Sequence, residues 1–289
     1  MEKTQTIGMI GTGVMGKSMA QHMLDHGYDV AIFTRTKEKA KSLIENGAIW
    51  KDKVADVAKV ADIIITMIGT PNDVEEVYLT DDGILAHAKP NTTLIDMTTS
   101  KPALAIDIYE KAKKKGIRVL DAPVSGGDVG AKNATLAIMV GGDKEVFDDM
   151  LPILQIMGTN IVYQGEAGAG QHTKMVNQIS IAPAMIGVCE ALIYANKAGL
   201  DPHTVLTSIS TGAAGSWSLD NYAPRMIAGD FAPGFAIKHF IKDMKIALES
   251  AQEMNMDTPG LSLALEMYEK LAAMGEEESG IHGLLKYYE

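Results

Sequence analysis

The sequence predicts an α/β amino-terminal domain with a Rossmann-type, doubly wound sheet and an all-α carboxyl-terminal domain, joined by a long inter-domain helix. Two observations predict this class. Short apolar segments alternate with helical patterns as far as Tyr163, which is typical of a mostly parallel sheet covered by helices. Beyond Tyr163 the strand patterns nearly vanish, and apolar residues recur at helical spacing between Gly and Pro breaks. We therefore expect one domain over residues 1–163 and a second over residues 164–289.

The first 36 residues form a βαβ pattern. An apolar strand from Ile7 to Ile10 runs into a glycine loop, a helix follows to about His26, and a second strand spans Asp29 to Phe33. The loop reads Gly11-Thr12-Gly13-Val14-Met15-Gly16. Gly11 permits a tight turn, Gly13 lets the backbone approach a pyrophosphate, and Gly16 lets the helix pack closely on the strand. The pattern predicts a dinucleotide site on residues 11–16, and a plain glycine turn is the alternative.

The residues after the second strand indicate which dinucleotide binds. Proteins that prefer NAD usually carry Asp or Glu there, which accepts hydrogen bonds from the ribose 2′-hydroxyl. This chain has Thr34, Arg35 and Thr36 instead. Without a carboxylate to repel it, a 2′-phosphate can bind the Arg35 guanidinium and the Thr36 hydroxyl. We therefore expect NADP to be preferred over NAD, and an ordinary solvated loop is the alternative.

Further strands are predicted in the first half, over residues 63–68, 93–96, 119–121, 136–140 and 161–163. The run Ile63-Ile64-Ile65 lacks polar alternation, as expected of a strand buried on both faces. In such sheets, ligands collect at the carboxyl ends of the strands. We therefore expect Met67, Ile68, Gly69 and Thr99 to border the cofactor.

The second half begins with three glycines, Gly165, Gly168 and Gly170, which precede a long helix expected from about Gln171 to Lys197. Many of the 18 methionines lie in the helical segments, where they are expected to fill irregular gaps in the core. The apolar surface of these helices exceeds what one face of the first domain is expected to cover. We therefore expect a homodimer or homotetramer built through residues 170–289.

The composition excludes several classes of function. A net charge of −11 argues against nucleic acid or an anionic membrane as a partner, because either needs a basic face. The single cysteine, Cys189, excludes an intramolecular disulfide, and the seven histidines are scattered, so no metal site is expected. No apolar run approaches the roughly 18 residues of a membrane span, and the polar start of the chain is not a signal peptide. These features predict a cytoplasmic, globular protein.

Two further segments carry side chains suited to chemistry. Lys174 and Asn177, at i and i+3, share one face of the long helix. If that face lines a cleft between the domains, Lys174 can give a proton to a carbonyl oxygen as a general acid, or accept it in reverse. Two solvated side chains are the alternative. The loop Ser125-Gly126-Gly127 offers a hydroxyl and successive N–H groups, which form a nest for a carboxylate unless the loop is a simple glycine turn.

Together these segments resemble the β-hydroxyacid dehydrogenase family, which includes 3-hydroxyisobutyrate dehydrogenases, tartronate semialdehyde reductases and glyoxylate/succinic semialdehyde reductases. The resemblance spans nearly the whole chain. The family's motifs fall on the glycine loop, on D-A-P-V-S-G-G from Asp121 to Gly127, on G-x-G-x-x-x-K-x-x-N from Gly168 to Asn177, and on K-D-x-x-x-A from Lys242 to Ala247. The resemblance implies that Ser125, Gly126 and Gly127 bind a substrate carboxylate and that Asn177 orients it. It also implies that Lys174 is the acid/base and that Lys242 reaches cofactor and substrate.

The chain departs from the family's pattern at several positions. Gln178 stands where the family often has Asn, and Asp128 stands at a position that is often apolar. His282 lies in a tail that lacks the family's D-x-S-A pattern, and we expect it to be a surface histidine or to contact substrate. These departures leave the identity of the substrate open. Lys174 and Asn177 argue against the related imine reductases, which generally replace the Lys, and 6-phosphogluconate dehydrogenases, which carry His at the second position.

The sequence and the resemblance together predict NADPH-dependent reduction of a small aldehyde acid, of the semialdehyde or glyoxylate type, to the corresponding hydroxy acid. NAD-linked oxidation of 3-hydroxyisobutyrate is the alternative enzyme, and Arg35 without a nearby acid argues against it. A non-catalytic NADP-binding scaffold is a third interpretation, against which the presence of Lys174, Asn177 and Ser125 argues. The expected partner is a small anionic hydroxy acid or aldehyde acid.

Overall fold

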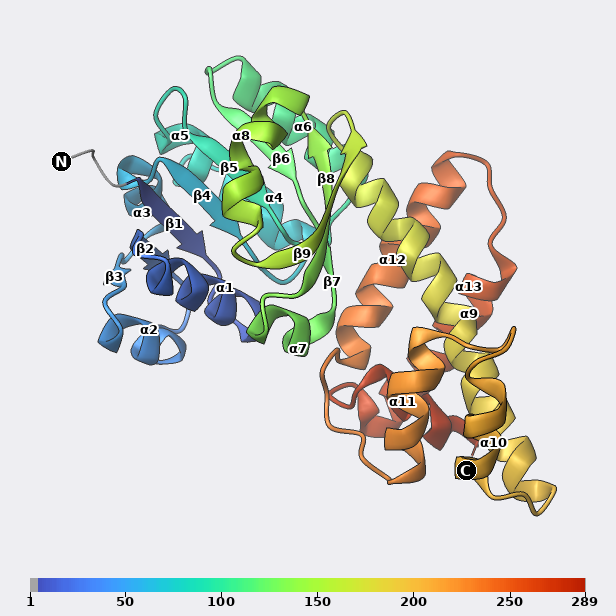
Figure 1. The fold of residues 1–289 in the computed structure, drawn as a ribbon. Helices are drawn as coiled ribbons and strands as arrows, with labels where there is room; N and C mark the ends of the chain where they lie inside the picture. Colours follow the sequence, from blue (N-terminus) through green and yellow to red (C-terminus); the bar gives the residue numbers. More distant parts are fainter. Residues whose placement is uncertain (1–4, 289) are drawn as a thin grey trace. The chain divides into compact units, whose positions relative to one another are not determined.

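The computed structural model describes residues 5–288 and divides into two compact units, which we call unit 1, up to Lys174, and unit 2, from Met175 (Figure 1). Residues 1–4, part of the polar start on which the cytoplasmic prediction rests, lie outside the described range. The sequence places the domain boundary between residues 163 and 164. The start of helix α9 (Ala169–Lys197) groups with unit 1 because the Gly168 and Gln171 N–H groups both donate to the Asp121 carboxylate.

Unit 1 is built on a nine-stranded sheet with the order β3-β2-β1-β4-β5-β6-β8-β7, in which β9 pairs with β8. Its strands are β1 (Thr6–Ile10), β2 (Asp29–Phe33), β3 (Ile49–Trp50), β4 (Ile63–Thr66), β5 (Thr93–Asp96), β6 (Arg118–Asp121), β7 (Val124–Ser125), β8 (Leu136–Gly142) and β9 (Gly158–Gly165). The pairs of β8 with β6 and β7 are antiparallel, and the other pairs are parallel. The predicted α/β class with a mostly parallel sheet is confirmed.

The predicted strands are all present, with two differences. The two-residue strands β3 and β7 were not predicted, because so short a segment shows no periodicity. The strand predicted over residues 63–68 ends at Thr66. It ends there because the Ile68 N–H donates to the Thr98 side chain instead of continuing the ladder (3.1 Å).

Helices cover both faces of the sheet (Figure 1). The apolar core on one face contains residues of α1 (Val14–Asp25), η1 (Lys37–Ala40), α2 (Lys41–Glu45), α7 (Gly127–Lys132) and α8 (Lys144–Leu154). The core on the other face contains residues of α3 (Val54–Val60), α4 (Pro71–Leu79), α5 (Ile84–His87) and α6 (Pro102–Lys113). In β4, Ile63 and Ile65 point into the first core and Ile64 into the second, which confirms that this strand is buried on both faces.

Unit 2 is helical, as predicted. It contains the rest of α9 with α10 (Pro202–Ile209), α11 (Trp217–Ile227), α12 (Ile237–Glu253), α13 (Pro259–Leu271), η2 (Ala272–Glu276) and η3 (Ile281–Tyr288). Met185, Met226 and Met244 are buried in its core, in agreement with their predicted role as packing residues. Among residues 5–288, α9 is the one helix long and apolar enough to cross a bilayer by length and composition. Its Ala182, Met185 and Cys189 are instead fully buried in this core.

Candidate active site

The loop between β1 and α1 has the geometry that the glycine pattern predicts. Gly11 adopts a positive φ of 94°, and its N–H donates to the Phe33 carbonyl at the end of β2 (2.9 Å). A Cβ on Gly11 would lie 2.2 Å from the Met67 carbonyl oxygen, and a Cβ on Gly16 would lie 1.9 Å from the Gly11 carbonyl oxygen. A Cβ on Gly13 would meet nothing within 4 Å. Gly11 and Gly16 therefore serve the turn and the helix packing, while Gly13 keeps an open approach to the backbone.

This loop fits the pyrophosphate of a dinucleotide. The Thr12 hydroxyl is buried and has no hydrogen-bond partner within residues 5–288, which leaves a polar group to be satisfied. The side chain of Val14 is exposed and that of Met15 is half-buried at the first turn of α1. The N–H groups of that turn have no partners within the helix, and with the helix dipole they favour an anion. Thr12 and the first turn of α1 would therefore hold the phosphates.

Arg35 lies just beyond the end of β2 and is exposed, between Thr34 and Thr36. Its Nη1 lies 2.9 Å from the Asp73 carboxylate, so the expectation of no nearby acid is wrong. Asp73 caps α4, because its other carboxylate oxygen accepts from the Thr70 N–H and hydroxyl (2.9 and 2.7 Å). β2 and β4 both flank β1, so the segments that follow them lie close together. Asp73, at the start of α4, therefore reaches Arg35 although it lies 38 residues later in the chain. The remaining guanidinium N–H groups can still bind a phosphate.

The loops after β4 and β5 lie at the same edge of the sheet as the glycine loop. The Met67 N–H donates to the Ile10 carbonyl (3.0 Å), and the Met97 N–H donates to the Thr66 carbonyl (2.9 Å). Met67, Ile68, Gly69 and Thr99 are each half-buried. This arrangement places the predicted cofactor-bordering residues beside the dinucleotide loop, and their contact with a cofactor stays a prediction.

The Ser125-Gly126-Gly127 segment joins β7 to α7. Ser125 ends the strand and is half-buried, and Gly126 and Gly127 have positive φ values of 128° and 63°. Only glycine adopts such values at low cost, and two in succession turn the chain sharply around its N–H groups. The ring of His22 on α1 lies 2.9 Å from the Ala131 carbonyl at the end of α7, which ties this segment to the dinucleotide helix. Asp128 is half-buried in the first turn of α7.

The start of α9 is anchored on the ends of β5 and β6. The Asp121 carboxylate accepts from the Gly168 and Gln171 N–H groups (both 2.8 Å), at the amino end of the helix. Burial raises the pKa of Asp121 to about 6, against the lowering effect of these two hydrogen bonds. Lys174 follows Gln171 by one turn and is buried. Unit 1 therefore carries the dinucleotide loop, the Ser-Gly-Gly segment and Lys174.

In unit 2, the residues of two predicted motifs form one polar cluster. Asn177 donates to the Gln178 side chain (2.6 Å), and Gln178 donates to the Asp243 carboxylate (2.7 Å). The Lys242 ammonium lies 3.1 Å from Asp243, and both Gln178 and Asp243 are buried. Gln178, which departs from the family's pattern, therefore links Asn177 on α9 to Asp243 on α12.

The expectation that His282 is a surface residue is wrong. Its ring is fully buried in unit 2 between Tyr222 and Phe231, at centroid distances of 4.9 and 5.8 Å. Its Nε2 lies 2.8 Å from the Asp230 carbonyl oxygen. Burial lowers the pKa of His282, because the charged imidazolium would lose its hydration. Apolar residues at its neighbours in sequence, Ile281 and Leu284, are the signal that could have indicated a core position.

Two features of unit 1 were missed by the sequence analysis. The Asp73 partner of Arg35 could have been found, because Thr70 and Asp73 have the spacing of a capping box and place the acid in the first turn of α4, the helix after β4. The anchoring role of Gln171 could not, because its partners Thr98 and Ser100 lie more than 70 residues earlier in the chain.

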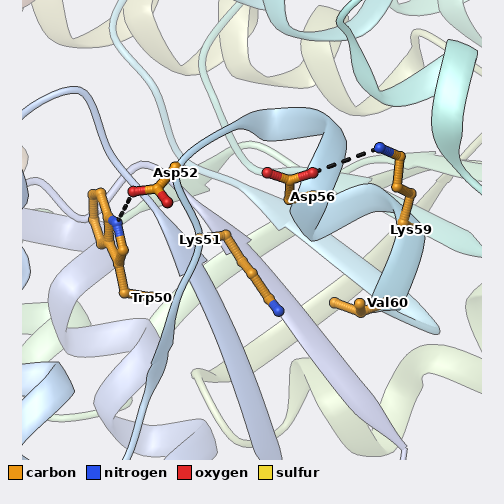
Figure 2. Close-up of a pocket in the computed structure, with 6 residues that line it drawn as sticks. All are labelled: Trp50, Lys51, Asp52, Asp56, Lys59 and Val60. Atoms are coloured by element: carbon orange, nitrogen blue, oxygen red, sulfur yellow. Dashed lines mark hydrogen bonds and ion pairs between the residues drawn. The ribbon is translucent and has the colours of Figure 1, made fainter.

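A surface depression of about 390 Å³ lies beside β3 and α3 (Figure 2). It is lined by Trp50, Lys51, Asp52, Asp56, Lys59 and Val60. The Trp50 ring N–H donates to Asp52 (2.8 Å), and Lys59 pairs with Asp56 (3.5 Å), as the dashed lines in Figure 2 show. None of the predicted site residues lines the depression. Among residues 5–288, no group of three or more His, Cys, Asp or Glu side chains could hold a metal ion.

Two family models together cover nearly the whole chain. Residues 6–165 match the NAD binding domain of 6-phosphogluconate dehydrogenase, and residues 168–288 match the NAD-binding domain of NADP-dependent 3-hydroxyisobutyrate dehydrogenase. The boundary between the two matches lies close to the predicted one at residues 163 and 164.

Several proteins are similar to this chain over most of its length. An uncharacterized oxidoreductase, YkwC, of Bacillus subtilis is 63% identical over 98% of this chain and 99% of the relative. A probable 3-hydroxyisobutyrate dehydrogenase-like protein of Arabidopsis thaliana is 46% identical over 96% of this chain and 84% of the relative. The NAD-dependent L-serine dehydrogenase of Pseudomonas aeruginosa is 35% identical over 98% of this chain and 97% of the relative. The structure of Mycobacterium tuberculosis 3-hydroxyisobutyrate dehydrogenase with L-serine superposes with a TM-score of 0.91 at 31% identity, covering 99% of each chain.

Proposed function

The chain belongs to the β-hydroxyacid dehydrogenase family, and on that premise we propose that it reduces a small aldehyde acid to the corresponding hydroxy acid with NADPH. NAD(P)-dependent oxidoreductase activity on hydroxy acids follows from the family. The aldehyde-acid substrate, the direction and the preference for NADPH are our proposals. The observation that carries the reaction is a buried Lys174 in the same compact unit as the dinucleotide loop and the Ser-Gly-Gly segment. The preference for NADPH rests on Arg35, just beyond the end of β2.

We assign a role to each group of the reaction. When bound, the nicotinamide would supply the hydride for the aldehyde carbon, or accept it from the alcohol in reverse. As the carbonyl oxygen gains negative charge, the Lys174 ammonium gives it a proton, so that C=O becomes CH–OH. In the reverse direction the neutral amine accepts the hydroxyl proton. The Ser125 hydroxyl and the Gly126 and Gly127 N–H groups bind the substrate carboxylate, Asn177 orients it, and Lys242 contributes positive charge toward cofactor and substrate.

The names of the relatives narrow the substrate class. L-serine and 3-hydroxyisobutyrate both carry a hydroxymethyl group on the carbon next to a carboxylate. We propose that this chain takes a substrate of that shape, with the aldehyde carbon two bonds from the carboxylate carbon. Tartronate semialdehyde and methylmalonate semialdehyde have it, whereas glyoxylate is shorter and succinic semialdehyde is longer.

A panel of these four aldehyde acids, each assayed with NADPH and NADH, tests the proposal. We expect the highest kcat/KM with one of the two three-carbon-backbone semialdehydes and NADPH. The proposed function would be contradicted if none of the four aldehyde acids were reduced with either cofactor and neither serine nor 3-hydroxyisobutyrate were oxidised. If kcat/KM were highest with glyoxylate or succinic semialdehyde, the proposed reaction would stand, but the proposed shape of the substrate would be rejected.

One observation favours a second candidate, the NAD-linked oxidation of 3-hydroxyisobutyrate. Asp73 places a carboxylate 2.9 Å from Arg35, where it can accept a hydrogen bond from a ribose 2′-hydroxyl or repel a 2′-phosphate. The same panel separates the two candidates, because NADH would then support the higher kcat/KM and the oxidation of 3-hydroxyisobutyrate would be the faster direction.

We also propose that the chain assembles as a homodimer or homotetramer through unit 2. Large apolar side chains are exposed on its helices, including Tyr194 on α9 (74%), Trp217 on α11 (62%) and Leu263 on α13 (51%). A second copy of the same chain would cover such side chains with closed symmetry. Sedimentation at micromolar concentration tests this, and a species of 30.9 kDa would contradict the proposal.

A further inference from the structure

The first turn of α9 is held by one fully buried side chain, that of Gln171. Its Nε2 donates to the Thr98 carbonyl (2.7 Å), and its Oε1 accepts from the Ser100 N–H (2.9 Å). Its own backbone N–H donates to the Asp121 carboxylate (2.8 Å). Both ends of the Gln171 side-chain amide are therefore hydrogen-bonded to the loop after β5. The Gln171 backbone N–H is hydrogen-bonded to the end of β6.

These hydrogen bonds continue into the loops predicted to border the cofactor. The Thr98 hydroxyl accepts from the Ile68 N–H (3.1 Å), and the Thr98 N–H donates to the Asp96 carboxylate (3.1 Å). Asp96 also accepts from the Thr66 hydroxyl (2.7 Å), at the end of β4. A buried network thus runs from the ends of β4 and β5 to the start of α9, and each member lies in unit 1.

The backbone at this point leaves α9 little room to shift. A Cβ on Gly170 would lie 2.4 Å from the Met139 carbonyl oxygen and 2.5 Å from the Asp121 carbonyl oxygen. The helix therefore begins in direct contact with β6 and β8. Gly165 and Gly168, just before it, both have positive φ values, so the chain turns sharply there and is then fastened by Gln171.

Lys174 follows Gln171 at i+3, so a rotation or shift of the first turn of α9 moves both residues together. From this geometry we propose that Gln171 is a positioning residue, which fixes the position of Lys174 relative to the loops after β4 and β5. The inference rests on the proposed function, because it takes Lys174 as the proton donor to a substrate held beside those loops. An error of about 1 Å in such a position can cost roughly 100-fold in rate.

The test compares three variants of the full-length chain with the wild type. Gln171→Met keeps the volume and removes both amide hydrogen bonds. Gln171→Glu keeps the acceptor and restores the donor only when the carboxyl is protonated. Tyr163→Phe is the matched control, because it removes one half-buried hydrogen bond of unit 1, from the Tyr163 hydroxyl to the Gly142 carbonyl, and keeps both amide hydrogen bonds of Gln171. Kinetics use the best substrate of the panel, and NADP binding is measured by fluorescence titration.

We expect Gln171→Met to lower kcat roughly 10- to 100-fold, with an NADP dissociation constant within about threefold of the wild type. For Gln171→Glu, the ratio of its kcat to that of the wild type should rise as the pH falls, because the protonated carboxyl can again donate to Thr98. Asp121 accepts from the backbone N–H of residue 171, Asp96 accepts from the Thr98 N–H, and Lys174 lies one turn further along α9. All three charged groups are present in the wild type as well. Tyr163→Phe should leave kcat unchanged.

A second measurement does not depend on turnover. Amide hydrogen exchange of residues 98–100 and 168–171 should be faster in Gln171→Met than in the wild type, and unchanged in Tyr163→Phe. A kcat equal to that of the wild type in Gln171→Met would overturn the inference and leave the proposed function intact. An equal loss in Tyr163→Phe, or a loss of NADP binding that parallels kcat, would also overturn it. If the wild type turned over none of the substrates, the proposed function itself would fail, and the inference with it.

Discussion

Unit 1 and unit 2 bury their polar side chains in different ways. In unit 1, buried hydrogen bonds join the ends of different strands and the start of α9. The Thr66 hydroxyl donates to Asp96, and Gln171 donates to Asp121 and to the Thr98 carbonyl, so the partners lie 30 to 73 positions apart in the sequence. In unit 2, the corresponding cluster of Asn177, Gln178 and Asp243 joins only two helices. The sheet gathers distant residues at one edge, whereas the helical unit pairs residues of neighbouring helices.

This difference suggests where each unit tolerates change. A buried polar network is sensitive at every member, because removal of one partner leaves the other unsatisfied. An apolar core adapts more easily, because substitutions that conserve its volume usually cost less than about 1.5 kcal/mol. We therefore expect substitutions at the strand edge of unit 1 to affect the reaction. Substitutions in the apolar core of unit 2, outside the cluster of Asn177, Gln178, Lys242 and Asp243, should affect mainly stability.

The largest effect on kcat is expected at Lys174, which follows the hydrogen-bond network of unit 1 and is the proposed proton donor. Lys174→Ala should lower kcat by roughly 10²- to 10⁴-fold, the range for loss of a positioned acid/base, while NADP still binds. Lys197→Ala is the matched control, because Lys197 is an exposed lysine at the end of the same helix. Steady-state kinetics and a fluorescence titration of NADP measure the two quantities. Turnover like that of the wild type in Lys174→Ala would reject its role as acid/base.

Arg35 should affect one cofactor and not the other. Arg35→Ala is expected to raise the KM for NADPH about 10- to 150-fold, because it removes a charge-assisted partner of the 2′-phosphate worth roughly 1.5–3 kcal/mol. The KM for NADH should change little. The thermal midpoint should also change little, because an exposed ion pair such as Arg35–Asp73 contributes about 0–1 kcal/mol. Arg118→Ala, which breaks the exposed pair with Asp149, is the control. Equal losses for both cofactors would make Arg35 a structural residue.

Two glycines of the same loop separate stability from binding. Gly16→Ala should destabilise unit 1 by roughly 1–3 kcal/mol, because the new methyl group would clash with the Gly11 carbonyl. Gly13→Ala should leave stability nearly unchanged and weaken NADP binding, because its methyl group would fill the space left open to the cofactor.

The two tryptophans provide a readout for each unit, Trp50 in unit 1 and Trp217 in unit 2. With Trp217→Phe as background, Trp50 fluorescence reports the unfolding of unit 1, and with Trp50→Phe, Trp217 reports unit 2. Gly16→Ala should shift the Trp50 transition more than the Trp217 transition. An equal shift of both would mean that the units unfold together, and it would weaken the comparison drawn above.

The sequence allowed the local features of this protein to be predicted, because they depend on near neighbours. The glycine loop, the strand buried on both faces and the long helix α9 all follow from residues within about one element of each other. The Asp73 partner of Arg35 and the Gln171 anchor were not predicted, because strand order brings them together. His282 was misplaced because the packing of the helices in unit 2 buries it against Tyr222 and Phe231, 60 and 51 residues earlier in the chain.

The smallest expected effect is an opposite dependence of the two units on pH. Burial raises the pKa of Asp121 in the folded state to about 6, above its unfolded value of about 3.9, so unit 1 binds a proton more readily when folded. The contribution of Asp121 to the stability of unit 1 should therefore rise as the pH falls from about 7 to about 5.5, by roughly 1 kcal/mol or less. Burial lowers the pKa of His282, so unit 2 should lose stability as the pH falls below the unfolded value of about 6.5.

Denaturant unfolding of the two single-tryptophan proteins across this pH range measures the two slopes separately. The variants Asp121→Asn and His282→Gln should each flatten the slope of their own unit. Asp121→Asn also replaces one acceptor oxygen by a donor that faces an N–H group, so its absolute stability will fall while its slope flattens. Parallel slopes in the two wild-type transitions would show that neither buried group controls the pH response of its unit. The contrast between the strand-edge network and the helical core would then hold for the reaction but not for stability.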